Sequence, residues 1–162
     1  MKRGGRKLRV GWFTFACCED STIMMTEMLN ERWQDWKAKI EFVHARILQA
    51  DNELKDIDVS FIEGAIASVP DEKKAKEIRK NSKYVVAIGA CAVDGMPAAQ
   101  RNTFDPVRKA EIEIVLQTFK HRENVVPLKE IIRVDDSVPG CPMQEDVFLK
   151  VLDKYLVLFK VI

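Results

Sequence analysis

Residues 84–88 read Tyr-Val-Val-Ala-Ile, a nearly all-apolar run, and Gly89-Ala90-Cys91 follows it directly. A strand that is apolar on both faces is typical of the centre of a parallel sheet, where helices cover both sides. This stretch therefore predicts a central strand of an α/β fold, with a cysteine just beyond its carboxyl end.

Strands and helices are predicted to alternate along the rest of the chain. The apolar runs predict strands over residues 8–15, 40–47, 57–62 and 130–134, and helical spacing with N-cap and proline signals predicts helices over 21–37, 71–81, 105–120 and 144–159. Asp20 or Ser21 is the expected N-cap of the first helix. Alternating strands and helices favour a parallel sheet with helices on both faces.

The four cysteines follow three of the predicted strands: Cys17 and Cys18 the first, Cys91 the fourth and Cys141 the fifth. Because ligands bind at the carboxyl ends of strands in such sheets, we expect these thiols to converge. Four thiolates are the number that a cubane iron–sulfur cluster needs. Zinc also takes four cysteines, but usually from closely spaced pairs, whereas Cys91 and Cys141 are 50 residues apart.

The adjacency of Cys17 and Cys18 carries its own structural requirement. Successive side chains of an extended strand point to opposite faces, so both sulfurs reach one cluster only if the backbone turns there. Two alternatives stay open: both ligate the same cluster, or one is a buried bystander. The following residues, Glu19 and Asp20, would repel a phosphate, which argues against a flavin or nucleotide site in this loop.

Length, composition and charge limit the function classes. A chain of 162 residues with 47% hydrophobic and 31% charged residues predicts one globular domain over residues 1–162. A net charge of +1 gives no reason to expect nucleic acid, and no apolar run is long enough to span a membrane. We expect a cytoplasmic protein, where thiols stay reduced. The first seven residues or so predict a basic tail, either solvated or docking an acidic partner; the basic residues up to position 9 are Lys2, Arg3, Arg6, Lys7 and Arg9.

Four segments together resemble a known family. They are the cysteine motif at 17–19, Ile-Asp-Val-Ser-Phe-Ile-Glu-Gly at 57–64, Val-Ala-Ile-Gly-Ala-Cys-Ala at 86–92 and Pro-Gly-Cys-Pro at 139–142. In this order and spacing, the chain resembles the small, electron-transfer subunit of nickel–iron hydrogenases and the homologous 20-kDa subunit of respiratory complex I. The resemblance covers nearly the whole chain.

The resemblance implies a flavodoxin-like, three-layer α/β domain with a mainly parallel sheet. It also implies one proximal 4Fe–4S cluster held by Cys17, Cys18, Cys91 and Cys141. The cluster would exchange electrons with the nickel–iron site of a large partner subunit, and a further iron–sulfur or flavin subunit would complete the chain of carriers. Adjacent cysteines resemble the complex I lineage, a quinone- or membrane-coupled alternative, whereas Glu19 resembles cytosolic hydrogenases. A zinc- or thiol-based binding module is the alternative from another class.

Three further residues are candidates for supporting roles. The resemblance implies that Glu19 relays protons; alternatively it caps the first helix. Glu63 is expected to tune the cluster through charge and hydrogen bonds, or to be an ordinary surface carboxylate. Arg101 is expected to bind cluster sulfurs or grip the partner, or to form a loop-stabilising salt bridge.

Overall fold

The computed structural model describes residues 5–162 and contains a five-stranded parallel sheet. Its strands run in the order β2-β1-β3-β5-β7, with β5 between β3 and β7 as the apolar run predicts. Their bounds are β1 Leu8–Thr14, β2 Ile40–Ala45, β3 Ile57–Glu63, β5 Ser82–Ile88 and β7 Asp136–Val138. This order places the topological switch point between β1 and β3, as in flavodoxins.

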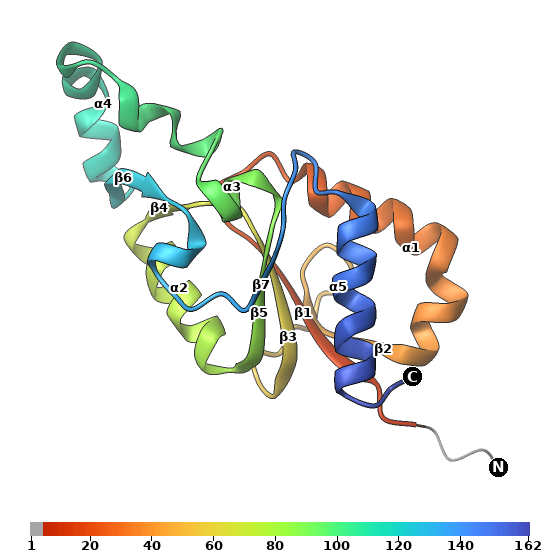
Figure 1. Ribbon diagram of the computed structural model, residues 1–162. Coiled ribbons are helices and arrows are strands. Elements are labelled where there is room, and N and C mark those ends of the chain that lie inside the picture. Colours follow the sequence, from red (N-terminus) through yellow and green to blue (C-terminus); the bar gives the residue numbers. More distant parts are fainter. Residues whose placement is uncertain (1–4) are drawn as a thin grey trace.

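Helices cover both faces of the sheet, which gives three layers (Figure 1). Helices α1 (Asp20–Lys39) and α5 (Glu145–Leu158) pack on one face, where Trp12 and Phe61 of the strands meet Phe148 of α5. Helix α2 (Val69–Lys80) and the short α3 (Gly89–Asp94) cover the other face. All seven residues of β3 are buried because both faces of this strand are covered. The predicted α/β, flavodoxin-like fold is confirmed.

The strand predicted over residues 130–134 is wrong. Residues 128–130 form a short 3-10 helix, η2 (Leu128–Glu130), and the edge strand β7 begins only at Asp136. The apolar pattern predicted a strand here because Ile132 is a buried core residue. It packs into the core on the α2 side from a segment that is neither helix nor strand. Asp135 fixes the register instead, since its N–H donates to the Val85 carbonyl over 2.8 Å and its carboxylate accepts from the Val85 N–H over 2.9 Å.

A small antiparallel pair of strands outside the main sheet was not predicted. β4 (Ile66–Ser68) pairs with β6 (His121–Val126), and η1 (Ala98–Thr103) and α4 (Pro106–Thr118) come just before β6 in the sequence. Helix α4 forms where the proline signal predicts a helix, but Figure 1 shows it extending away from the sheet, and none of its residues is buried. Within residues 5–162 no helix has both the length and the apolar character to cross a membrane.

The basic N-terminal segment is tied to the sheet where it is described. Lys2 and Arg3 lie outside the described residues. Arg6 donates to Asp58 of β3 over 2.7 Å, and the backbone N–H of Arg9 donates to the same carboxylate over 3.1 Å. The part that follows residue 4 is therefore anchored rather than simply solvated.

Asp58→Asn is expected to lower the free energy of unfolding by about 2 kcal/mol at neutral pH, because the buried side chain loses its ion pairs with Arg6 and Lys83. Asp58 also accepts from Lys83 over 2.7 Å. Burial alone would raise the pKa of Asp58, but its contacts with Lys83, Arg9 and Arg6 lower it overall. The stabilisation is thus present above the ordinary value of 3.8 and lost as the pH falls below it.

Urea denaturation across pH tests this expectation. The gap between Asp58→Asn and the parent should close in acid. Asp35→Asn is the matched control, since Asp35 is 61% exposed in its pair with Lys39 and should change stability by less than about 0.5 kcal/mol. Equal effects of the two variants would contradict the prediction.

Candidate metal centre

The chain turns sharply between β1 and α1, and the paired cysteines lie in this turn. Ala16 bridges Ala65 through two backbone hydrogen bonds of 3.1 and 3.0 Å, which ends the extended run. Cys17 follows in a bend, and Glu19 has a left-handed backbone with φ of 63°. The turn that adjacent cysteines require is therefore present, with Cys17 half-buried and Cys18 exposed.

Cys91 and Cys141 lie in two other segments at the same edge of the sheet. Cys91 is buried in α3, directly after β5, and Cys141 is exposed after β7. The Ala90 N–H donates to the Gly140 carbonyl over 2.7 Å, so the two segments are joined by backbone. A φ of 110° at Gly140 permits this approach without side-chain strain.

The two outer loops also meet across the site. The Cys141 Sγ donates to the Asp20 Oδ2 at 3.4 Å, and the Met143 N–H donates to the Ser21 hydroxyl at 3.2 Å. These contacts join the loop after β7 to the first turn of α1. The structure thus brings the segments that follow β1, β5 and β7 together around four thiols.

The thiols influence one another electrostatically. Burial raises the pKa of Cys17 to about 12, and Glu63, Cys91 and Cys18 add to the shift. Burial also raises the pKa of Cys91, with smaller contributions that include Cys18. The hydrogen bond to Asp20 raises the pKa of Cys141. These shifts favour the protonated thiols, so binding of a metal group would release protons.

The donor set fits a cubane cluster. Soft thiolates are the ligands that iron–sulfur clusters take, and four of them come from three segments here. Within residues 5–162, no three His, Cys, Asp or Glu side chains stand close enough together to hold a single metal ion. A cubane binds each thiolate through a different iron atom, so its ligands surround a group of atoms rather than one.

Glu63 is buried beneath the turn and caps α1. Its Oε1 accepts from the Ser21 N–H at 3.0 Å, and its Oε2 accepts from the Thr22 N–H at 3.1 Å and the Thr22 hydroxyl at 2.6 Å. It is only 2% exposed, so the surface-carboxylate alternative is wrong. Burial raises the pKa of Glu63, and the bonds from Thr22 and Ser21 partly offset that rise.

Glu63→Gln is expected to lower the free energy of unfolding by about 2 kcal/mol, because one buried helix N–H or hydroxyl would face an amide donor. Thermal or urea unfolding of the metal-free chain measures this cost. Glu53→Gln serves as the control, since its carboxylate is 75% exposed and should contribute less than about 0.5 kcal/mol. A loss no larger than that of the control would count against the capping role.

Within the described part of the chain, Glu19 does not cap the first helix through its side chain and Arg101 does not form a salt bridge, which were the structural alternatives to their functional roles. Glu19 holds the N-cap position expected for Asp20 or Ser21, but its side chain caps nothing and is exposed beside Cys18. Arg101 donates to the carbonyls of Ala67 and Arg122 over 3.0 and 2.7 Å. Among residues 5–162 it forms no ion pair, so the salt-bridge interpretation is wrong, while its backbone bonds still stabilise the loop.

The family model described as "NADH ubiquinone oxidoreductase, 20 Kd subunit" matches residues 17–155, a span that includes all four cysteines. The chain belongs to this family. The family resemblance inferred from the motifs is thereby confirmed.

Two relatives are hydrogenase subunits. The chain is 28% identical to a subunit of the F420-non-reducing hydrogenase of Methanothermobacter marburgensis, over 90% of this chain and 52% of the relative. It is 24% identical to the delta subunit of the NAD-reducing hydrogenase HoxS of Cupriavidus necator, over 91% of this chain and 78% of the relative. The chain thus spans about half the length of the archaeal F420-non-reducing hydrogenase subunits that it matches.

Solved structures show the same fold. A chain in the crystal structure of an NAD+-reducing [NiFe]-hydrogenase in the H2-reduced state superposes with a TM-score of 0.80 at 25% identity, covering 94% of this chain and 92% of that one. The actinobacterial-type NiFe-hydrogenase from Ralstonia eutropha H16 gives a TM-score of 0.65 at 16% identity, over 94% of this chain and 54% of that one. This second likeness concerns the fold alone.

Proposed function

We propose that this chain is an electron-transfer subunit that holds one 4Fe–4S cluster through Cys17, Cys18, Cys91 and Cys141. The observation that carries the proposal is the meeting of three cysteine-bearing segments at one edge of the sheet, joined to one another by hydrogen bonds. A bound cluster would supply one-electron transfer, and the protein would supply the four thiolates and a fixed cradle for them.

The electron partner that we propose is the nickel–iron site of a hydrogenase-type large subunit. Support comes from the hydrogenase names of the relatives and from the NAD+-reducing [NiFe]-hydrogenase structure. Hydrogen oxidation or proton reduction would belong to that subunit, and this chain would be non-catalytic. A second iron–sulfur or flavin subunit would take or supply the electrons on the other side. We place the assembly in the cytoplasm, where thiols stay reduced.

Three side chains around the cysteines have proposed supporting roles. Glu63 keeps α1 in register beneath Cys17 and, through its charge, tunes the cluster. Glu19 is exposed at the edge that a partner would cover, where a carboxyl group can relay protons. Arg101 steadies η1 through two carbonyl groups, and its further role toward the partner is part of the proposal.

A complex I-like, quinone- or membrane-coupled oxidoreductase is the second candidate function. The description of the family model and the adjacency of Cys17 and Cys18 favour it. The identity of the large partner separates the two candidates. A partner whose own cysteines bind nickel supports the hydrogenase function, and one without such cysteines supports the complex I-like function.

Anaerobic purification with the natural partners, followed by iron and sulfide assays, tests the proposal. About four irons and four sulfides per copy are expected after subtraction of the partners' centres, with a reduced-cubane EPR signal after dithionite treatment. Zinc without sulfide, or no metal, would overturn the proposal and favour a zinc- or thiol-based binding module.

A further inference from the structure

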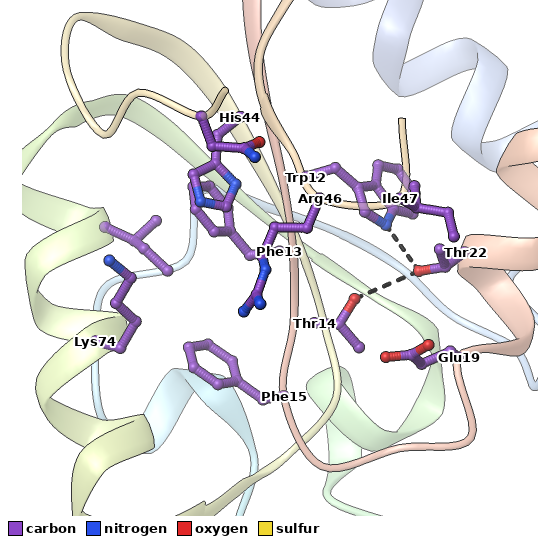
Figure 2. Close-up of a pocket in the computed structure, with 12 residues that line it drawn as sticks. Trp12, Phe13, Thr14, Phe15, Glu19, Thr22, His44, Arg46, Ile47 and Lys74 are labelled. Atoms are coloured by element: carbon purple, nitrogen blue, oxygen red, sulfur yellow. Dashed lines mark hydrogen bonds between the residues drawn. The ribbon is translucent and has the colours of Figure 1, made fainter. Parts of the chain in front are cut away.

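A cavity of about 760 Å³ opens beside the cysteine turn, at the carboxyl ends of β1 and β2. Figure 2 shows Phe13, Phe15, His44 and Lys74 around one part of it, and Arg46 reaching in from the chain after β2. Phe15 lies two residues before Cys17, so this cavity and the cysteine turn share one edge of the sheet.

Arg46 has no partner for its charge within the part of the chain that the structure describes. Its side chain is exposed and its guanidinium forms neither a hydrogen bond nor an ion pair there, and Figure 2 shows the guanidinium pointing toward Phe15 and Lys74. The carboxylate in the cavity wall, Glu19, lies on the other side of β1 in this view. The free guanidinium is therefore directed into open space.

The loop that carries Arg46 is held in place by Asn52. The Asn52 Oδ1 accepts from the Ala45 N–H at 2.7 Å, and its Nδ2 donates to the Gln49 carbonyl at 3.0 Å. Lys74 lies on the opposite wall, where its amine pairs with Glu77 over 3.2 Å, so Arg46 carries the unpaired positive charge. His44 stacks on Phe13 with ring centroids 4.2 Å apart, and burial, together with Lys74 and Arg46, lowers its pKa. The cavity is thus a recess with aromatic walls, beside an anchored loop that carries the unpaired charge of Arg46.

A partner that covers the cysteine edge would remove water from this recess. An unpaired guanidinium that loses its water costs several kcal/mol, so a covering surface must offer it an acceptor. Arginine prefers a carboxylate, which it binds through two parallel hydrogen bonds. We propose that Arg46, with Lys74 nearby, receives an Asp or Glu side chain of the subunit that covers the cysteines. The inference rests on the proposed function, because that function requires a partner at this edge.

Charge reversal in the complex tests the inference. Arg46→Glu is expected to raise the dissociation constant of the purified subunits by about 30-fold or more, because a paired and desolvated charge is replaced by a repelling one. Lys80→Glu is the matched control: Lys80 is exposed, forms no ion pair within the described residues and ends α2 just before the amino end of β5, so its reversal should leave the affinity unchanged.

A chemical crosslink identifies the contact directly. Arg46→Lys places an amine in the recess, and a carbodiimide should join it to a carboxylate of the partner, as read by peptide mass spectrometry. The native amine of Lys80, at the amino end of the strands, should give no such product in the same samples. Unchanged affinity of Arg46→Glu together with no crosslink from Arg46→Lys overturns the inference, as does inorganic phosphate binding at this recess within the intact complex. Iron, sulfide and EPR assays of the same samples judge the proposed function separately, since cluster content does not depend on the Arg46 contact.

Discussion

Cys91→Ala is expected to remove the cluster and leave the fold intact. Cys91 is 7% exposed and would be the buried ligand of the set. Loss of a group that merely supports a metal ligand costs about 10- to 100-fold in affinity, so loss of a ligand should cost at least as much. Iron and sulfide per chain should therefore fall about tenfold in the purified complex, and the reduced-cubane EPR signal should vanish with them.

Ser82→Ala is the matched control for this variant. Ser82 is 8% exposed at the amino end of β5, the strand whose carboxyl end leads to Cys91. Both variants remove one buried heavy atom. Ser82→Ala also removes hydrogen bonds to the Ser60 hydroxyl (2.6 Å) and the Ile78 carbonyl (2.7 Å), so it should cost at least as much stability as Cys91→Ala, about 1 to 2 kcal/mol. Only Cys91→Ala should lose iron. Equal iron in the two variants, with both folded by circular dichroism, would remove Cys91 from the ligand set.

Gly64→Ala is expected to lower the free energy of unfolding by about 3 kcal/mol, because backbone strain and steric overlap act together. Gly64 has a φ of 92°, and an added Cβ would lie 2.7 Å from the Phe15 carbonyl carbon and 2.9 Å from the Ala16 nitrogen. Both are backbone atoms, so neither neighbour can rotate away. The displaced segment is the one that leads into Cys17 and Cys18, so iron content should fall with stability.

Alanine substitutions at two other glycines separate the cost of backbone strain from the cost of steric overlap. Gly5→Ala meets nothing within 4 Å and should change stability by less than about 0.5 kcal/mol. Gly95 has a φ of 89° but its nearest neighbour is 3.4 Å away, so Gly95→Ala should cost only the strain, about 1 kcal/mol. Urea midpoints of the metal-free proteins should follow this order. A Gly64 variant as stable as the Gly5 variant would show that the added Cβ does not clash with the backbone of Phe15 and Ala16.

The parallel sheet could be predicted because its information is local. The apolar run at 84–88 marks a strand covered on both faces, and the observed β5 contains it. The alternation of elements then places the strand ends, and with them the cysteines, at one edge. Each of these steps needs only the order of residues along the chain.

The details that were missed depend on contacts between distant residues. Glu63 caps a helix that begins at Asp20, far earlier in the chain, and no cap signal within α1 points to it. Strand β7 has only three residues and is positioned through Asp135 and Val85, so an apolar pattern could not locate it. The Glu19 side chain is exposed on a residue with a left-handed backbone, and the sequence of this acidic turn does not predict that backbone conformation.

The hydrogen bonds between the cysteine-bearing segments have a consequence for the order of biogenesis. Ala90 is bonded to Gly140, and Met143 to Ser21, through atoms that no cluster would use. These contacts need no metal, unlike those of a zinc finger, which folds only around its metal. Insertion of the proposed cluster would then complete a site whose backbone segments these bonds already hold together.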